Sequence, residues 1–233
     1  MQSAKPPVNQ PLELILLTHA TEFDKKTNTG ALVAPALAGF SHITVSRKAW
    51  SRVAPDPTLS LPSVTGGFKL ASAQAIEQVS ELGSKQEHAD VTAKGSNGIL
   101  WLLYPSLQAV QLSADNECSG DDLLKKLQCA QSNGFTEPSS ASDSTQSALV
   151  HRFILLDATW QLAHKMYRQS PYLQQLPSIM LHSSQPSAYL LRKNQRQQGW
   201  CTAESVALLL KAIGQHAASS QLSEAFHLFN QRK

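Results

Sequence analysis

The segment FILLDATWQLAHKMYR, residues 153–168, places an acid close to several bases. Asp157 ends an apolar run typical of a buried strand, and Thr159 and Trp160 follow it in a helix-forming stretch. At the mouth of a sheet, a carboxylate can bind the ammonium group of a ligand or accept a proton from a substrate. Asp157 could instead be a helix N-cap that accepts hydrogen bonds from the amides of Thr159 or Trp160. The Trp160 ring alone is more typical of a core residue than of a ligand contact.

Basic residues follow Asp157 in two groups. Lys165 and Arg168 are three residues apart, so they share one face of a helix. Arg192, Lys193 and Arg196 form the second group. These cations favour contact with the phosphates of a nucleic acid. A basic face that only contacts solvent would have the same pattern.

The charge of the chain is uneven along its length. Residues 1–150 carry 11 Lys and Arg against 14 Asp and Glu, whereas residues 151–233 carry 9 against 3. Five of the eight histidines lie in the second part. A positive C-terminal third favours a polyanionic partner, although charge alone does not separate this from a solvated basic surface.

Two more segments carry polar residues next to expected turns and helix ends. Thr202 precedes an apolar helix-forming run and is predicted to be its N-cap, with Glu204 in the first turn. The sequence Thr-Asn-Thr-Gly at residues 27–30 is by default a turn, in which Gly30 supplies backbone freedom.

Buried strands and helices must position these residues. Apolar runs predict strands at residues 12–18, 42–45, 98–104, 151–157 and 178–181. Helices are predicted at residues 31–38, within 71–82, and at 158–169 and 203–213, with Pro35 expected to end or kink the first. Strands that alternate with helices imply an α/β fold, with a mostly parallel sheet covered by helices on both faces. Such sheets bind ligands beyond the carboxyl ends of their strands.

Two stretches interrupt this pattern. Residues 51–98 are irregular and rich in Pro and Gly, and residues 113–147 are rich in Ser, Asp, Gln and Asn. We interpret the first as a variable excursion and the second as a polar insert. The 233 residues are otherwise expected to form one domain.

Several function classes lack their sequence signals. There is no GxGxxG and no GxxxxGK[ST] motif. The three cysteines form no CxxC pair and the histidines form no HExxH, so neither a disulfide framework nor a metal site is expected. No apolar stretch approaches the roughly 18–20 residues of a membrane span, and Glu13 interrupts the short N-terminal apolar run. We therefore expect a soluble, cytoplasmic protein that is not bound to a membrane.

Taken in order, five motifs resemble the DTW-domain family of tRNA-uridine aminocarboxypropyltransferases. They are TNTGALV, LLYPS, LLDATWQLAHKMYRQSPYLQQLP, SAYLLRK and CTAESVALLL. The family's Asp-x-Thr-Trp signature stands at Asp157, Thr159 and Trp160. The resemblance implies an α/β fold related to the knotted SPOUT methyltransferases. It also implies that S-adenosylmethionine donates its 3-amino-3-carboxypropyl group to N3 of a tRNA uridine, with methylthioadenosine as the by-product.

The same resemblance implies roles for most of the candidate site residues. Asp157 would be the general base, since uridine N3 is a poor nucleophile until it loses its proton. The residues expected around the cofactor are Thr27, Asn28, Thr29, Gly30, Tyr104, Pro105, Leu156, Thr159, Trp160, Arg192, Thr202 and Glu204. The clustering of positive charge, and not the resemblance, selects the residues expected to bind tRNA, which are Lys165, Arg168, Lys193 and Arg196. Many family members have an N-terminal cysteine cluster suggestive of zinc, which this sequence lacks, so no metal is expected.

Two alternative functions remain at this point. A methyltransferase of related fold would use the same cofactor but release S-adenosylhomocysteine. An RNA-binding protein without catalytic activity would not bind the cofactor. The sequence does not identify the tRNA or the modified position, and we favour a monomer.

Overall fold

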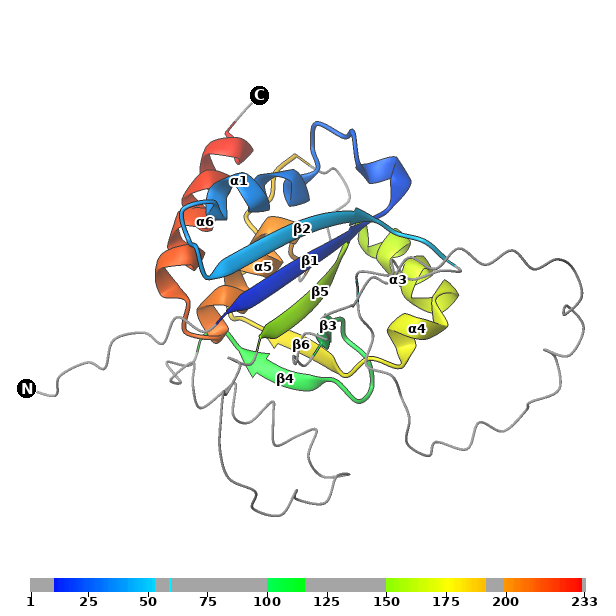
Figure 1. Ribbon diagram of the computed structural model, residues 1–233. Helices are drawn as coiled ribbons and strands as arrows, with labels where there is room; N and C mark the ends of the chain where they lie inside the picture. The colour runs from blue at the N-terminus through cyan, green and yellow to red at the C-terminus, as the bar shows by residue number, and fades with distance from the viewer. Residues whose placement is uncertain (1–10, 53–58, 60–99, 116–149, 192–198, 232–233) are drawn as a thin grey trace, which may run out of the picture.

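The computed structural model describes residues 11–52, 59, 100–115, 150–191 and 199–231. Within these ranges, six parallel strands form one sheet in the order β2-β1-β5-β3-β6-β4 (Figure 1). The strands are β1 (Leu12–Thr18), β2 (Ile43–Ala49), β3 (Leu100–Leu103), β4 (Val110–Ser113), β5 (His151–Asp157) and β6 (Ser178–His182). The predicted α/β fold with a parallel sheet is confirmed.

Helices cover both faces of the sheet (Figure 1). One face carries α1 (Val33–Leu37), α5 (Thr202–Ala212) and α6 (His216–Asn230), and the other carries α3 (Trp160–Gln169) and α4 (Pro171–Gln174). Two short 3-10 helices, η1 (Ala20–Glu22) and η2 (Thr29–Leu32), follow β1. The helices thus enclose the sheet as the sequence predicts.

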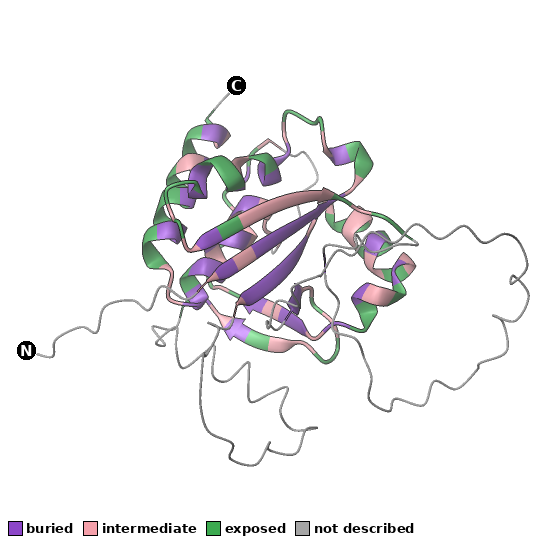
Figure 2. Ribbon diagram, viewed as in Figure 1, coloured by how far each residue is buried: buried purple, intermediate pink, exposed green. Residues whose placement is uncertain are grey.

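The two hydrophobic cores follow from the alternation of side chains along the strands. Leu14 and Leu16 of β1 pack with α1, α5 and α6. Ile15 and Leu17 point to the opposite face and pack with α3 and α4. β1 and β5 are therefore buried on both faces, as Figure 2 shows, which explains why their sequences are continuous apolar runs.

The strand and helix boundaries largely agree with the sequence. β2 is longer than predicted, because residues 46–49 continue to pair with residues 15–18 of β1. This is an edge strand, where polar side chains such as Lys48 are tolerated. β4, α4 and α6 are elements that the sequence pattern did not predict.

The expected break at Pro35 is wrong. The segment begins as the 3-10 helix η2, and the α-helix starts only at Val33. Pro35 therefore lies in the first turn of α1, where its missing N–H and fixed φ angle are tolerated. The helix continues to Leu37.

The predicted excursions at residues 51–98 and 113–147 lie almost wholly outside the described residues, as does the helix predicted within 71–82. Ser113, at the start of the predicted insert, is the last residue of β4. Within the described ranges, none of the helices has the length and apolar character that a membrane span requires.

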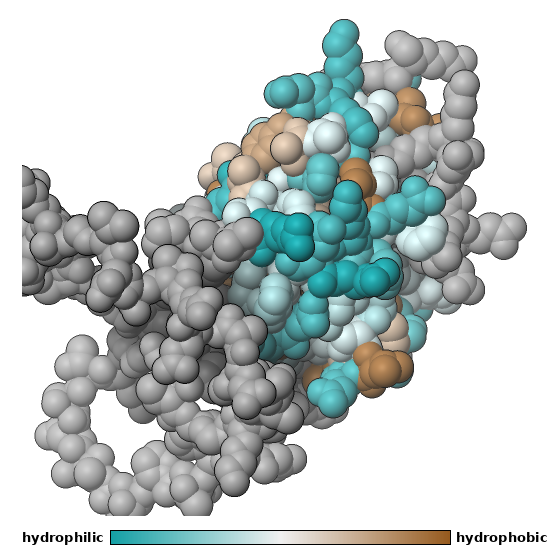
Figure 3. All heavy atoms as spheres, turned by 90° about the vertical axis from the view of Figure 1, so that its right-hand side faces the viewer, coloured by the Kyte–Doolittle hydropathy of each residue, from teal (hydrophilic) through white to brown (hydrophobic). Residues whose placement is uncertain are grey.

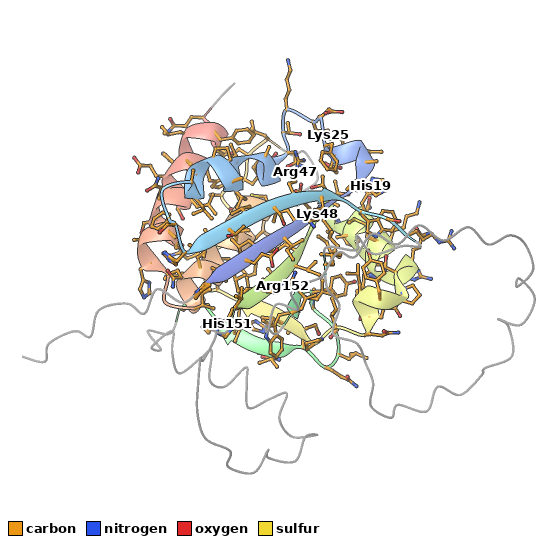
Figure 4. The ribbon with its side chains drawn as sticks, viewed as in Figure 1. His19, Lys25, Arg47, Lys48, His151 and Arg152 are labelled. Carbon is orange, nitrogen blue, oxygen red and sulfur yellow. The ribbon has the colours of Figure 1, made fainter. Side chains whose placement is uncertain are left out.

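Buried polar residues stabilise the amino-terminal end of β5. Figure 4 shows His151 and Arg152 at this end, far from Arg47 and His19 near the carboxyl ends of the strands. Arg152 Nε donates to Glu13 Oε2 of β1 at 2.5 Å, and Arg152 Nη1 donates to the Leu59 carbonyl at 3.1 Å. Only 2% of His151 is exposed, and burial lowers the pKa of its imidazole below the ordinary 6.5.

This pKa shift predicts an acid-sensitive contribution to stability. The unfolded chain binds a proton at His151 in a pH range where the folded chain does not. The contribution of the neutral side chain is thus complete above about pH 6.5 and is lost as the pH falls. We expect the free energy of unfolding, measured in urea at pH 7.5 and pH 5, to fall less in His151→Gln than in the wild type. One proton accounts for at most about 1.4 kcal/mol per pH unit.

The exposed His216 supplies the control for this comparison. His216→Gln should lose as much stability between the two pH values as the wild type. Equal losses in His151→Gln and His216→Gln would contradict the assignment.

Candidate functional site

A cleft opens beyond the carboxyl ends of β3, β5 and β6. Its walls include Tyr104 and Pro105 after β3, residues 158–160 after β5, and residues 183–187 after β6. Trp200 and Thr202, next to the start of α5, also line it. Parallel sheets place their ligands at this edge, because loops and helix N-termini converge there.

The junction between β5 and α3 forms one wall of the cleft. Thr159 is the N-cap of α3, with an extended backbone and an Oγ1 that accepts a hydrogen bond from Leu162 N at 3.4 Å. The helix therefore begins at Trp160 rather than at the predicted Ala158. Asp157 is not the N-cap, so the capping interpretation of this residue is wrong. Trp160 is 47% exposed and lines the cleft, so it is not a core residue either.

The Asp157 carboxylate is buried behind the cleft, with only 1% of the residue exposed. Thr18 Oγ1 donates to Oδ2 at 2.8 Å, and Asn28 Nδ2 donates to the same oxygen at 3.1 Å. Thr202 Oγ1 donates to Oδ1 at 2.8 Å. Arg47 approaches Oδ2 with Nε and Nη2, each at 3.3 Å. A carboxylate offers about four acceptor positions, so these donors occupy its capacity.

The Asp157 contacts join segments that are distant in the sequence. Thr18 and Asp157 are the last residues of β1 and β5 and are paired in register. Arg47 belongs to the edge strand β2, and its guanidinium also donates to the carbonyls of Glu22 and Phe23. One carboxylate thus ties three strand ends to the loop after β1 and to the start of α5.

Gly30 is required for space rather than for backbone freedom. A Cβ atom at this position would lie 2.5 Å from the Asp157 carboxylate. Gly214 is the glycine with positive φ among the described residues, so Gly30 does not occupy that region. The neighbouring Asn28 caps η2 by accepting from Ala31 N at 3.2 Å. The turn at residues 27–30 therefore packs closely against the Asp157 carboxylate.

Glu204 stabilises the start of α5 and the adjoining cleft wall. The N-cap of α5 is Cys201, one residue before the predicted Thr202, and Glu204 completes a capping box by accepting from Cys201 N at 2.8 Å. The same carboxylate accepts from Ser187 Oγ and Ala188 N, each at 2.7 Å. Glu204 does not line the cleft, but it holds Ser187, which does.

The segment after Ser187 is held by three further contacts. The Tyr189 hydroxyl donates to the Thr27 carbonyl. Leu190 N donates to Asn230 Oδ1 at 2.9 Å, and Asn230 Nδ2 donates to the Ala188 carbonyl at 2.6 Å. The C-terminal helix α6 therefore helps to fix the wall of the cleft, although Asn230 carries no local sequence signal of this role.

The structure divides the predicted cofactor residues into two groups. Those that line the cleft are Thr27, Tyr104, Pro105, Leu156, Thr159, Trp160 and Thr202. Asn28, Thr29, Gly30 and Glu204 are not among its lining residues. Arg192, Lys193 and Arg196 lie outside the described residues. Lys165 and Arg168 are exposed on α3, and their contact with tRNA stays a prediction.

Thiolate chemistry is not supported at this site. Burial, together with the nearby Glu204 carboxylate, raises the pKa of the Cys201 thiol to about 12. The thiol therefore stays protonated at neutral pH and is a weak nucleophile. In the part of the chain that the structure describes, no three His, Cys, Asp or Glu side chains lie close enough together to hold a metal ion.

The chain matches one known family over its whole length. A family model described as the DTW domain matches residues 1–233. No solved structure matches the chain. The Asp157, Thr159 and Trp160 signature lies at the β5–α3 junction, where the last two residues line the cleft. The chain therefore belongs to the DTW domain family, the family of tRNA-uridine aminocarboxypropyltransferases.

Proposed function

We propose that this protein transfers the 3-amino-3-carboxypropyl group of S-adenosylmethionine to N3 of a tRNA uridine. The C–S bond to this group breaks, a C–N bond to N3 forms, the N3 proton is lost and methylthioadenosine is released. Membership of the family supports tRNA modification. The observation that carries the proposal for this chain is the cleft at the carboxyl ends of three strands, lined by the signature residues Thr159 and Trp160.

The walls of the cleft suit a nucleoside with a charged tail. The lining includes apolar side chains, such as Leu103 and Leu181, and the hydroxyl groups of Ser183 and Thr202. Aromatic rings, among them Trp200, complete the lining. A pocket of this kind can cover a base and still offer hydrogen bonds to a ribose.

A charged pair at the cleft suits the amino-acid portion of the same ligand. Lys25 Nζ lies 2.7 Å from Glu22 Oε1, and both residues line the cleft. Lys25 is half exposed, whereas Glu22 is buried. The exposed part of the Lys25 ammonium can donate a charge-assisted hydrogen bond to the carboxylate of an amino acid, while Glu22 holds the ammonium in place. We therefore assign the methionine portion to this side of the cleft.

Asp157 is best explained as a positioning residue. A general base must come within hydrogen-bond reach of the proton that it removes. The Asp157 carboxylate is buried, is absent from the cleft lining and accepts from several side chains, including the cleft residue Thr202. Its role as a general base stays a prediction. This geometry favours an indirect role, in which Asp157 positions residues that line the cleft, such as Thr202.

The first test concerns the reaction itself. We expect the protein, incubated with S-adenosylmethionine and bulk tRNA, to release methylthioadenosine and to yield a uridine heavier by one aminocarboxypropyl group. Mass analysis of the nucleosides detects both products, and a chelator should not prevent them. Release of S-adenosylhomocysteine would identify a methyltransferase instead. Absence of cofactor binding in calorimetry would favour an RNA-binding protein without catalytic activity.

The second test separates the two roles of Asp157. Asp157→Asn removes the charge opposite Arg47 and turns an amide N–H₂ toward groups that donate. A positioning role predicts weaker cofactor binding and a loss of about 1–3 kcal/mol of stability, since buried donors lose their acceptor. A general base predicts normal cofactor affinity and a single-turnover rate lower by about 10²-fold or more.

The Glu13–Arg152 pair at the opposite end of the sheet supplies the control. Glu13→Gln also removes a carboxylate from an arginine, so it should reduce stability while cofactor affinity is retained. Equal changes of cofactor affinity in Asp157→Asn and Glu13→Gln would show that the location of Asp157 behind the cleft does not matter for cofactor binding, which would contradict the positioning role.

The third test displaces the carboxylate without changing its charge. In Gly30→Ala, the new Cβ would clash with the Asp157 carboxylate at 2.5 Å. The clash should reduce thermal stability and weaken cofactor binding measured by calorimetry. Gly39→Ala is the matched control, because nothing lies within 4 Å of a Cβ at that position. Unchanged cofactor affinity in Gly30→Ala would contradict the expectation that close packing between the turn and Asp157 supports cofactor binding.

A further inference from the structure

A second cleft lies beside the first and shares Tyr104, Pro105 and His164 with it. Its lining adds Leu107, which is fully exposed, together with Tyr167 and Arg168 of α3. The proposed reaction assigns no role to this second cleft. Because the clefts share residues, a molecule bound in one would lie next to a molecule bound in the other.

An ordered aromatic wall lines the second cleft. The rings of Tyr104 and Tyr167 are stacked, with centroids 4.0 Å apart and an interplanar angle of 18°. The Tyr104 hydroxyl and His164 Nδ1 form a hydrogen bond of 2.9 Å. These contacts fix the rings before any ligand binds, which lowers the entropic cost of stacking a base against them.

The adjoining surface of α3 is positive. Trp160, His164 and Arg168 are all exposed and follow one another at four-residue intervals, so they form one stripe along the helix. Lys165 is exposed beside them, and α3 contains no Asp or Glu. Neither Lys165 nor Arg168 forms an ion pair with another described residue. Figure 3 shows hydrophilic side chains gathered on the side of the molecule that carries α3 and α4.

The stripe is long enough for more than one nucleotide. Eight residues of helix span about 12 Å, whereas successive nucleotides of a stacked strand are about 3.4 Å apart. Aromatic rings beside cations are the usual binding surface for single-stranded nucleic acid, because rings stack on bases and cations contact phosphates. An acidic protein segment would match the cations but would gain less from stacked tyrosines.

We propose that the second cleft binds the nucleotide next to the uridine that is modified. Its base stacks against the wall formed by Tyr104 and Tyr167, and its phosphate contacts Arg168. This inference rests on the proposed function, because the modified uridine must enter the first cleft. It requires the target to be presented in a single-stranded part of the RNA.

Variants of residues that line only the second cleft test the proposal. The affinity for bulk tRNA is measured by filter binding at several salt concentrations. Tyr167→Leu, which removes the ring, should weaken binding about tenfold or more, whereas Tyr167→Phe, which retains it, should bind as the wild type does. Arg168→Gln should weaken binding and lower the salt slope by about one. All three variants should bind S-adenosylmethionine normally in calorimetry, which also shows that they are folded.

Lys211, exposed in the last turn of α5, supplies the control for charge. Lys211→Gln should leave the affinity and the salt slope unchanged. Equal affinities of Tyr167→Leu and Tyr167→Phe for tRNA overturn the proposal, because the aromatic ring then makes no stacking contact with a base. This holds even if Arg168→Gln binds tRNA weakly, since that result shows only a phosphate contact. Binding of tRNA by every variant at the wild-type level also overturns it and favours a protein partner for this cleft.

The experiments distinguish a failure of this proposal from a failure of the proposed function. If the variants behave as expected but the wild type forms no aminocarboxypropyl product, the second cleft stands as a binding site for a nucleotide and the proposed reaction fails. If the product forms and the variants bind and react as the wild type does, the reaction stands and the second cleft has no such role.

Discussion

The arrangement of the candidate site depends on one buried carboxylate. Asp157 accepts hydrogen bonds from Thr18, Asn28 and Thr202, and it lies against the Arg47 guanidinium. An ionised group away from water is costly unless its acceptor positions are filled. The strand ends, the loop after β1 and the start of α5 meet at this point and supply the donors that fill those positions. The loop after β1, the β5–α3 junction and the start of α5 also line the cleft, so this part of its wall depends on the contacts of Asp157.

A second carboxylate has a similar role at another wall of the cleft, formed by residues 183–187. Glu204 caps α5 and also accepts from Ser187 and Ala188. Asn230 of α6 holds the next residues of that wall. Neither Asp157 nor Glu204 lines the cleft, although the residues that they hold do. Both carboxylates thus hold residues that line the cleft without lining it themselves.

The sequence predicted the elements whose patterns are strong and local. β1 and β5 are continuous apolar runs because they are buried on both faces. β4 has only four residues, and the first buried residues of α6 are the small Ala218 and Ser219, so their patterns are weak. The ordered motifs led to seven residues that line the cleft, whereas other lining residues, such as Lys25, Ser183 and Trp200, were not predicted. Thr18 and Arg47 were missed because they lie 139 and 110 residues from Asp157 in the chain, and only the parallel pairing of the strands brings them together.

A double-mutant cycle between Asp157 and Thr202 tests whether Asp157 affects cofactor binding through the residue that it holds. Thr202 lines the cleft and donates to Asp157, whereas Asp157 does not line it. The free energy of S-adenosylmethionine binding is measured by calorimetry for the wild type, Asp157→Asn, Thr202→Val and the double variant. If Asp157 acts through the residues that it holds, the two changes should be coupled by about 1 kcal/mol or more. Additive effects on binding, or full cofactor affinity in Asp157→Asn, would contradict this account.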